Sequence, residues 1–355
     1  MLEYKLMKQL LLDYNINELT DLVLSLGEPK FRAKQLFAWI MQGVDFEGMT
    51  NLPKVFLEKL KAGYLAQGVK IERVLTSKDK SEKYLFKMQD GELVEGVYLP
   101  NSYGNTLCIS TQIGCRMGCV FCASGSGGLI RNLSAGEILG QYIAVVSKKA
   151  TSISNIVLMG SGEPLDNYDN VIKFLRLITD KDGINKSSRN ISLSTCGLVP
   201  KIKELAEEGM GITLSLSLHA TTDEARQKLM PIAKKYSIAE TMSAMRYYFE
   251  KTGRRVVFEY IPIENMNASQ HDAKRLAELT KGLSCHINLI ALNAIDKNDK
   301  ESQKKLQPLS KKEADNFLRE LTTLGISASL RRSYGSDIAG ACGQLRSTFV
   351  LNSKK

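Results

Sequence analysis

Three of the seven cysteines, Cys115, Cys119 and Cys122, lie within eight residues of one another. Thiolates with this C-x3-C-x2-C spacing can bind one metal centre, and sulfur ligands favour zinc, copper or an iron–sulfur cluster. A structural zinc site usually has four protein ligands, and no fourth Cys or His lies nearby. A [4Fe-4S] cluster held by three cysteines leaves one iron able to bind a small molecule, which favours catalysis. A zinc site completed by a distant ligand is the alternative that the spacing leaves open.

Strand and helix patterns alternate along the chain around and beyond these cysteines. Ser134 with Glu137 predicts a capping box at the start of the helix that follows the cysteines. Six strand–helix units predict an α/β fold in which a parallel sheet curls into a partial (β/α)6 barrel resembling a TIM barrel. The predicted strands are 106–110, 153–159, 190–194, 211–218, 255–261, 285–292 and 327–330.

Small and polar residues stand where several of these strands end. Barrel enzymes place their active sites at the carboxyl ends of the strands, and the cysteines follow the first strand. Each residue alone has an ordinary interpretation, such as a tight turn or a packed histidine. Their convergence on the rim that also carries the cysteines predicts a ligand site. These residues are Gly162, Glu163, Ser194, Ser217, Leu218, His219 and Asn293.

The first 95 residues have a different pattern. Apolar spacing and turn signals predict three short helices, near 17–26, 31–40 and 55–60. An antiparallel β meander is expected after them, over 71–99. We therefore divide the chain into an N-terminal helical accessory domain with the meander (1–95), the barrel (96–333) and a C-terminal segment (334–355).

Composition limits the class of protein. The chain has 355 residues, 24% of them charged, which is typical of a globular protein with a large core. No secretion signal or membrane span is expected, and the clustered cysteines favour the reducing cytoplasm over a disulfide framework. A net charge of +10 is compatible with a polyanionic partner.

The cysteine motif with its Phe121 and glycine-rich flank resembles the cluster loop of radical S-adenosylmethionine (AdoMet) enzymes. Over nearly its whole length, the chain is similar to the RlmN/Cfr family of radical AdoMet adenine methyltransferases. The matching runs are 95–98, 106–110, the cysteine stretch, 162–165, 194–197, 217–219, 288–290, Asn293 and 337–345. The resemblance is closest to the RlmN branch, which methylates C2 of adenosine 2503 in 23S rRNA and also adenosine 37 in tRNA.

This resemblance implies the cofactors and the partners. Cys115, Cys119 and Cys122 would hold a [4Fe-4S] cluster, and the rim residues would contact AdoMet, two molecules of which are used per turnover. The N-terminal helices resemble an RNA-binding appendage. The expected partners are 23S rRNA, tRNA and an electron donor such as flavodoxin or ferredoxin, for a cytoplasmic monomer without membrane contact.

The resemblance also assigns the chemistry to three other residues. Cys342 would carry the methyl group as S-methylcysteine, and a carbon radical on that group would add to the base. Glu95 would accept the ring proton. Cys108 would then attack the Cys342 sulfur, releasing the product and leaving a transient disulfide. A buried inert thiol is the ordinary fate of a lone cysteine, and we expect that of Cys196 and Cys285.

Three alternatives remain open from the sequence. One is the C8-methylating, antibiotic-resistance branch of the same family. The others are an iron–sulfur RNA-binding protein and a radical AdoMet activating enzyme, neither of which would need a Cys108/Cys342 pair. Departures from the family pattern fall around the AdoMet site, and the basic residues near Cys342 are candidate phosphate contacts. The departures are Ser161, Ala291, Ala294 and Gly340, and the basic residues are Arg331, Arg332 and Arg346.

Overall fold

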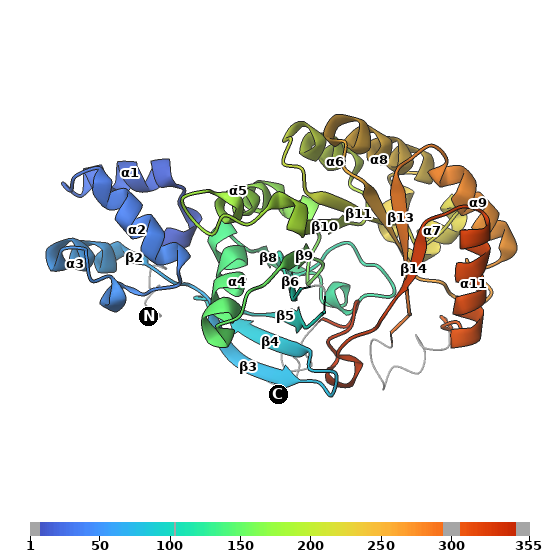
Figure 1. The fold of residues 1–355 in the computed structure, drawn as a ribbon, viewed down its shortest axis with the longest axis horizontal. Coiled ribbons are helices and arrows are strands. Elements are labelled where there is room, and N and C mark those ends of the chain that lie inside the picture. Colours follow the sequence, from blue (N-terminus) through green and yellow to red (C-terminus); the bar gives the residue numbers. More distant parts are fainter. Residues whose placement is uncertain (1–7, 103, 294–305, 346–355) are drawn as a thin grey trace, which may run out of the picture.

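The computed structural model describes residues 8–102, 104–293 and 306–345. One ten-stranded sheet forms the centre, with the strand order β14-β13-β12-β11-β10-β9-β6-β5-β4-β3. Helices cover the outer face of its curled part, and the N-terminal helices form a separate group at one end (Figure 1). The expected partial barrel is confirmed. Ala294 and Arg346 lie outside the described residues.

Seven strands of the sheet are parallel to their neighbours, so their carboxyl ends share one rim. Six of them are followed by helices, which gives the six expected units. Because the sheet ends in edge strands β14 and β3, the barrel is open. The seven are β6 (Thr106–Ile109), β9 (Asn155–Leu158), β10 (Ile191–Thr195), β11 (Thr213–Ser217), β12 (Val256–Tyr260), β13 (Cys285–Ile290) and β14 (Ala328–Arg331).

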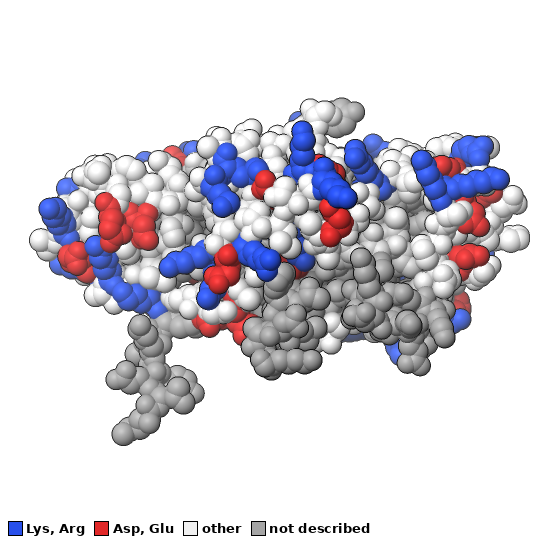
Figure 2. All heavy atoms as spheres, turned by 90° about the horizontal axis from the view of Figure 1, so that it is seen from below, with Lys and Arg blue, Asp and Glu red and all other residues white. Residues whose placement is uncertain are grey.

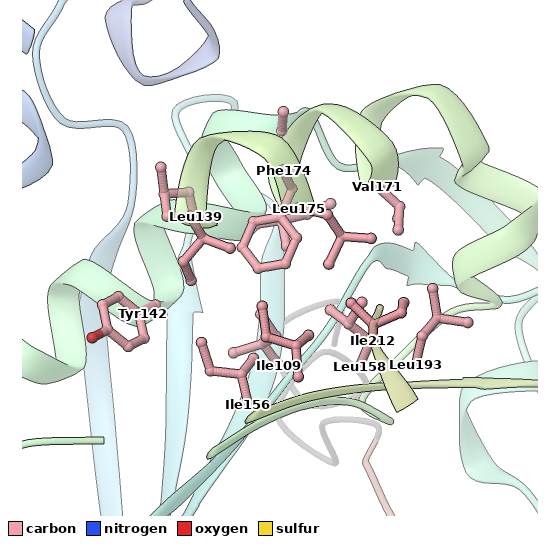
Figure 3. Close-up of a cluster of buried hydrophobic side chains, with 14 of the residues drawn as sticks. Ile109, Leu139, Tyr142, Ile156, Leu158, Val171, Phe174, Leu175, Leu193 and Ile212 are labelled. Carbon is pink, nitrogen blue, oxygen red and sulfur yellow. The ribbon is translucent and has the colours of Figure 1, made fainter. Parts of the chain in front are cut away.

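The barrel helices bury apolar faces against the sheet. Figure 3 shows Leu139, Phe174 and Leu175 above the strand residues Ile109 and Ile156. The predicted capping box at Ser134 is present, and Ser237, Ser269 and Ser310 form three more. The helices are α4 (Ala135–Lys149), α5 (Tyr168–Thr179), α6 (Val199–Glu207), α7 (Asp223–Leu229), α8 (Ile238–Thr252), α9 (Gln270–Thr280) and α11 (Lys311–Thr323).

The N-terminal region contains α1 (Ile16–Ser25), α2 (Phe31–Met41) and α3 (Lys54–Gly63), close to the expected positions. A short parallel pair, β1 (Gln9–Leu10) with β2 (Tyr64–Leu65), closes this unit. It contacts the barrel through Asp13, whose carboxylate accepts a 2.6 Å hydrogen bond from Gly136 N. Asp13 thereby accepts from a main-chain N–H group in the first turn of α4 that has no partner within the helix.

The meander consists of β3 (Lys70–Thr76), β4 (Glu82–Lys87) and β5 (Leu93–Leu99), paired antiparallel as expected. β5 also pairs antiparallel with β6, so the meander continues the barrel sheet without a break. Residue 95, at which we divided the chain, lies inside β5. Since β5 runs opposite to β6, the amino-terminal half of β5 reaches the rim of the barrel.

Two elements near the rim were not expected from the sequence. One is an antiparallel pair, β7 (Gln112–Gly114) with β8 (Leu129–Asn132), which forms the base of the loop that carries the clustered cysteines. The other is the short helix α7, which follows β11. None of the described helices is both long and apolar enough to cross a membrane.

Candidate active site

The clustered cysteines lie on the cysteine loop, residues 115–128, between β7 and β8. A main-chain turn shapes the loop, because Cys122 N donates to Cys119 O at 3.1 Å. An ion pair holds it from outside: the Arg116 guanidinium donates to both oxygens of Asp166 at 2.8 and 2.6 Å. This forked contact fixes the loop against the segment that follows β9.

The three thiols fit a multi-iron cluster better than a single ion. Cys115, Cys119 and Cys122 line one cavity, yet no three His, Cys, Asp or Glu side chains in the described chain could share one metal ion. In a [4Fe-4S] site each thiolate binds a different iron, so the thiols need not meet at one point. Burial raises the pKa of Cys115 to about 11, and metal binding would displace that proton. The donor set therefore fits a cluster with one iron left open.

The same cavity extends from the cysteine loop to the rim of the sheet. Of the seven residues expected to contact AdoMet, Leu218 and Asn293 are not among those that line it. Leu218 is fully buried, and the Asn293 amide donates to Cys342 O at 3.1 Å. The five that line the cavity are Gly162, Glu163, Ser194, Ser217 and His219. The structure thus brings together most of the predicted rim residues.

Glu163 is held by main-chain donors. One of its carboxylate oxygens accepts from Leu165 N at 3.0 Å and the other from Cys196 N at 2.7 Å. Burial raises its pKa, and these hydrogen bonds oppose the increase. Gly162 before it has φ +105°, and a Cβ there would lie 2.6 Å from Gln112 Cβ, so only glycine fits. The carboxylate therefore has a fixed position in the cavity wall.

His219 is a neutral, buried imidazole. Its Nδ1 accepts a hydrogen bond from Ile261 N at 3.1 Å, which leaves the proton on Nε2. Burial, with a smaller contribution from the charge of Arg226, lowers the pKa of His219 to about 3. The ring packs edge-on against Phe121 of the cysteine loop, with 4.6 Å between centroids. His219 can therefore contact a ligand as a donor or a packing surface without carrying charge.

The C-terminal loop, residues 332–345, docks on the cysteine loop. Ala123 N donates to Gly343 O at 2.8 Å, and the Ser124 hydroxyl donates to Leu345 O at 2.7 Å. Cys342 is exposed and lines the cavity together with the clustered cysteines. Residues more than two hundred positions apart therefore share one site.

Cys108 lies behind this cavity rather than in its wall. It is buried on β6, in a small apolar cluster with Leu345, and it is a free thiol, as is Cys342. Burial raises the pKa of Cys108 to about 12, with a smaller contribution from the nearby Cys342. Cys108 is therefore a protonated thiol at neutral pH that is close to Cys342 but not bonded to it.

Glu95 is buried on β5 beside an ammonium group. The Lys83 Nζ lies 2.9 Å from Glu95 Oε1, and it also donates to Ala339 O of the C-terminal loop at 3.1 Å. Oε1 is thus paired with Lys83, whereas Oε2 has no hydrogen-bond partner in the described chain. Burial raises the pKa of Glu95, and the charge of Lys83 opposes this. The carboxylate thus has free lone pairs to accept a proton.

Two residues of the site were not predicted from the sequence, and a third was expected in a different role. Glu259 is buried, lines the cavity and has one unpartnered oxygen, while Arg226 is fully buried behind the rim. Arg331, expected on an RNA-facing surface, also lines the cavity. Glu259 lies near the end of the apolar strand β12, where a charged residue was the available signal. Arg226 lies in a segment for which no helix or strand was expected, and nothing in the neighbouring sequence marked it. Cys196, expected in the core, is buried but reaches the cavity wall.

Comparison with known proteins shows the family to which the chain belongs. A family model described as the radical SAM superfamily matches residues 109–277. Another, described as the ribosomal RNA large subunit methyltransferase N-terminal domain, matches residues 10–64. A Clostridium novyi protein named "Probable dual-specificity RNA methyltransferase RlmN" is 47% identical over 345 residues, covering 96% of this chain and 99% of its own length. The chain belongs to the RlmN family of radical SAM methyltransferases.

Other relatives of the RlmN family extend this match. A Clostridium perfringens relative with the same name is 48% identical over 96% of this chain and 97% of its own length. The crystal structure of a radical SAM methyltransferase from Sphaerobacter thermophilus has a TM-score of 0.90 and 38% identity, covering 95% of this chain and 99% of that one. The chain is a radical SAM RNA methyltransferase, and a [4Fe-4S] cluster and AdoMet are its cofactors.

Proposed function

We propose that this RlmN-family chain methylates C2 of an adenosine in 23S rRNA, adenosine 2503, and adenosine 37 in tRNA as a second substrate. The observation that carries the proposal is the position of Cys342, which docking of the C-terminal loop places in one cavity with the clustered cysteines and the rim. A methyl carrier must lie beside the AdoMet site, and this arrangement supports that role. The names of the relatives support two RNA classes.

The cofactors are assigned to the residues around this cavity. Cys115, Cys119 and Cys122 would hold the cluster, which would supply the electron for reductive cleavage of AdoMet. Two AdoMet molecules are used per turnover. The rim residues bind AdoMet; Glu163 and the polar strand ends support this by their fixed positions in the cavity wall, while Leu218 and Asn293 would act from its margin.

Three residues carry the remaining steps. The Cys342 thiolate accepts a methyl group by displacement and becomes the link to the base. Glu95 takes the proton from the ring carbon, for which Oε2, which has no partner among the described residues, is suited. The Cys108 thiolate attacks the Cys342 sulfur and forms a disulfide; the electron pair of the broken carbon–sulfur bond stays on the carbon attached to the base, which takes up a proton and becomes the methyl group. The proximity of the two free thiols supports this last step.

The partners follow from the same reasoning. The N-terminal helices form the RNA-binding appendage, and basic side chains elsewhere would contact phosphates; Figure 2 shows Lys and Arg side chains from one end of the visible face to the other, with acidic side chains between them. Contacts to phosphates would help to extrude the target base from its stack. Flavodoxin or ferredoxin would donate the electron, and the protein would act as a monomer in the cytoplasm.

The position of the methyl group is tested directly. The purified, anaerobically reconstituted protein is incubated with AdoMet, a reductant and 23S rRNA fragments that contain the target adenosine. After digestion, mass spectrometry of the nucleosides should identify 2-methyladenosine. Dominant 8-methyladenosine would assign the chain to the resistance branch, and unmodified RNA with a full cluster would contradict the proposal.

A further inference from the structure

Arg226, on α7, is a buried cation that forms no ion pair within the described chain. It has the largest volume among the fully buried side chains and no exposed surface. None of the ion pairs of the described residues includes it, and Asp223, a carboxylate on its own helix, accepts from Ile238 N instead. Because a guanidinium remains protonated in proteins, an uncompensated charge at this depth costs several kcal/mol.

The Arg226 guanidinium reaches the carboxyl ends of two rim strands. It donates to Cys196 O at 2.7 Å, Ser217 O at 3.1 Å and Leu218 O at 3.1 Å. Carbonyl dipoles offset part of the desolvation cost but carry no net charge. The third nitrogen, Nη1, is buried and has no hydrogen-bond partner among the described residues. Arg226 therefore has both an unbalanced charge and an unused donor.

The cysteine loop packs against the helix that carries Arg226. Val120 N donates to Leu229 O, in the last turn of α7, at 3.0 Å. Cys119 packs in the same apolar cluster as Leu229 and Met230. The groups whose charge would act on Arg226 are the thiols of Cys196 and Cys119 and, with a smaller effect, the carboxylate of Asp223. Cys196 is not among the proposed cluster ligands, and its main-chain carbonyl already accepts from the Arg226 guanidinium.

Cys119 is different, because cluster binding makes it a thiolate. We propose that Arg226 is the buried counter-charge of the cluster: its guanidinium balances the thiolate of Cys119 and raises the reduction potential. This rests on the proposed assignment of Cys119 as a cluster ligand. A nearby positive charge favours the reduced cluster, which has one more negative charge, and net charge is one determinant of the potential.

Arg226 thus acts on the cluster through its charge, as a positioning residue that does not contact substrate. Two substitutions separate the effect of its charge from that of its shape. Arg226→Met removes the charge and keeps much of the length, whereas Arg226→Lys keeps the charge without the fork. Arg254→Met is the matched control. Arg254 is partly buried and has an unpartnered Nε, but it donates to Thr213, at the opposite end of β11 from the rim.

The experiment measures the midpoint potential of the anaerobically reconstituted proteins by redox titration followed by electron paramagnetic resonance, without AdoMet. We expect Arg226→Met to shift the potential to a more negative value, Arg226→Lys to stay closer to wild type, and Arg254→Met to be unchanged. Equal potentials in wild type and Arg226→Met, at full iron content, would overturn the proposal. If Arg226→Met does not fold, Arg226→Gln replaces it as the uncharged variant.

Thermal unfolding gives a second readout. Binding of the cluster should increase Tm more in wild type than in Arg226→Met, because only in wild type does the cluster compensate a buried charge. Arg226→Met lacks the hydrogen bonds to the carbonyls both with and without the cluster, so their loss cancels when the two forms of the variant are compared. Equal increases would contradict the counter-charge. Folded Arg226→Met and Arg226→Lys proteins that both fail to bind iron would also contradict it, since shape rather than charge would then matter. Wild-type protein without iron would instead refute the proposed cluster ligands.

Discussion

The ammonium of Lys83 lies 2.9 Å from the carboxylate of Glu95, and both side chains are almost completely buried. The same ammonium binds Ala339 O, so one side chain contacts the proposed base and the loop that carries Cys342. The sequence separates these three residues widely. Through these two contacts, Lys83 affects both the protonation of Glu95 and the position of the C-terminal loop.

Replacing Lys83 with Met should shift the pH dependence of methyl transfer. Burial already raises the pKa of Glu95, and Lys83 opposes that increase, so the variant carboxyl should bind its proton more tightly. Because Glu95 acts as a base when deprotonated, activity is lost as the pH falls through its pKa. The acidic limb of the rate profile should therefore move to higher pH. Lys87→Met, at a half-exposed site on the same strand, should leave the limb in place; an unmoved limb in Lys83→Met would contradict this role.

The three clustered cysteines should each be required for the cluster. Alanine at Cys115, Cys119 or Cys122 removes one thiolate, and two remaining ligands should not retain a stable cluster. Iron content and cluster absorbance after anaerobic reconstitution measure this. Cys285→Ala and Cys196→Ala should retain about four irons per chain, the number in a [4Fe-4S] cluster. Stoichiometric zinc without iron uptake in wild type would refute the ligand assignment.

The two lone cysteines should fail at different steps. Cys342→Ala removes the methyl acceptor, so neither protein nor RNA should gain a methyl group although the cluster remains. Cys108→Ala should still form the RNA adduct but lack the thiolate that releases it. RNA bound covalently to Cys108→Ala after denaturant washing is the readout, and Cys342→Ala in addition should abolish it. Free turnover by Cys108→Ala would contradict the assignment.

Release of the adduct by wild-type protein should accelerate with pH. Burial raises the pKa of Cys108 to about 12, so near neutral pH its thiolate fraction increases roughly tenfold per pH unit, and attack on sulfur requires the thiolate. In single-turnover reactions quenched with denaturant, the covalent species should decay faster between pH 7 and pH 9. A rate of decay that is independent of pH would indicate that the buried thiol does not limit release.

Gly343→Ala should undock the C-terminal loop. Gly343 has φ +80°, and a Cβ there would lie 2.8 Å from Phe121 O of the cysteine loop. Gly282→Ala is the control, because it has a similar φ of +72° but no atom within 4 Å. Both should lose about 1–2 kcal/mol of stability from the left-handed backbone. Only Gly343→Ala should also lose methylation of Cys342 while keeping its iron, as measured by mass spectrometry of the intact protein.

The sequence by itself determined the alternation of strands and helices and the rim residues, because both signals are local. Apolar runs predicted the parallel strands. The position of Ser194 and Ser217 at the ends of two strands, and of Gly162 just beyond a third, predicted the rim. The cysteine spacing is local as well. Cys342 and Cys108 were found only through resemblance to a family, since a lone cysteine has no local pattern that distinguishes a reactive thiol from a buried one.

Only the tertiary structure decided which distant groups meet and which charges are buried. The antiparallel pairing of β5 with β6 brings Glu95 to the rim, and docking of the C-terminal loop brings Cys342 to the cavity. Lys83 and Arg226 look like ordinary surface cations in the sequence. Burial changes their role, because the energy of a charge depends on the surrounding dielectric and its partners, and neither is encoded in the neighbouring residues of the chain.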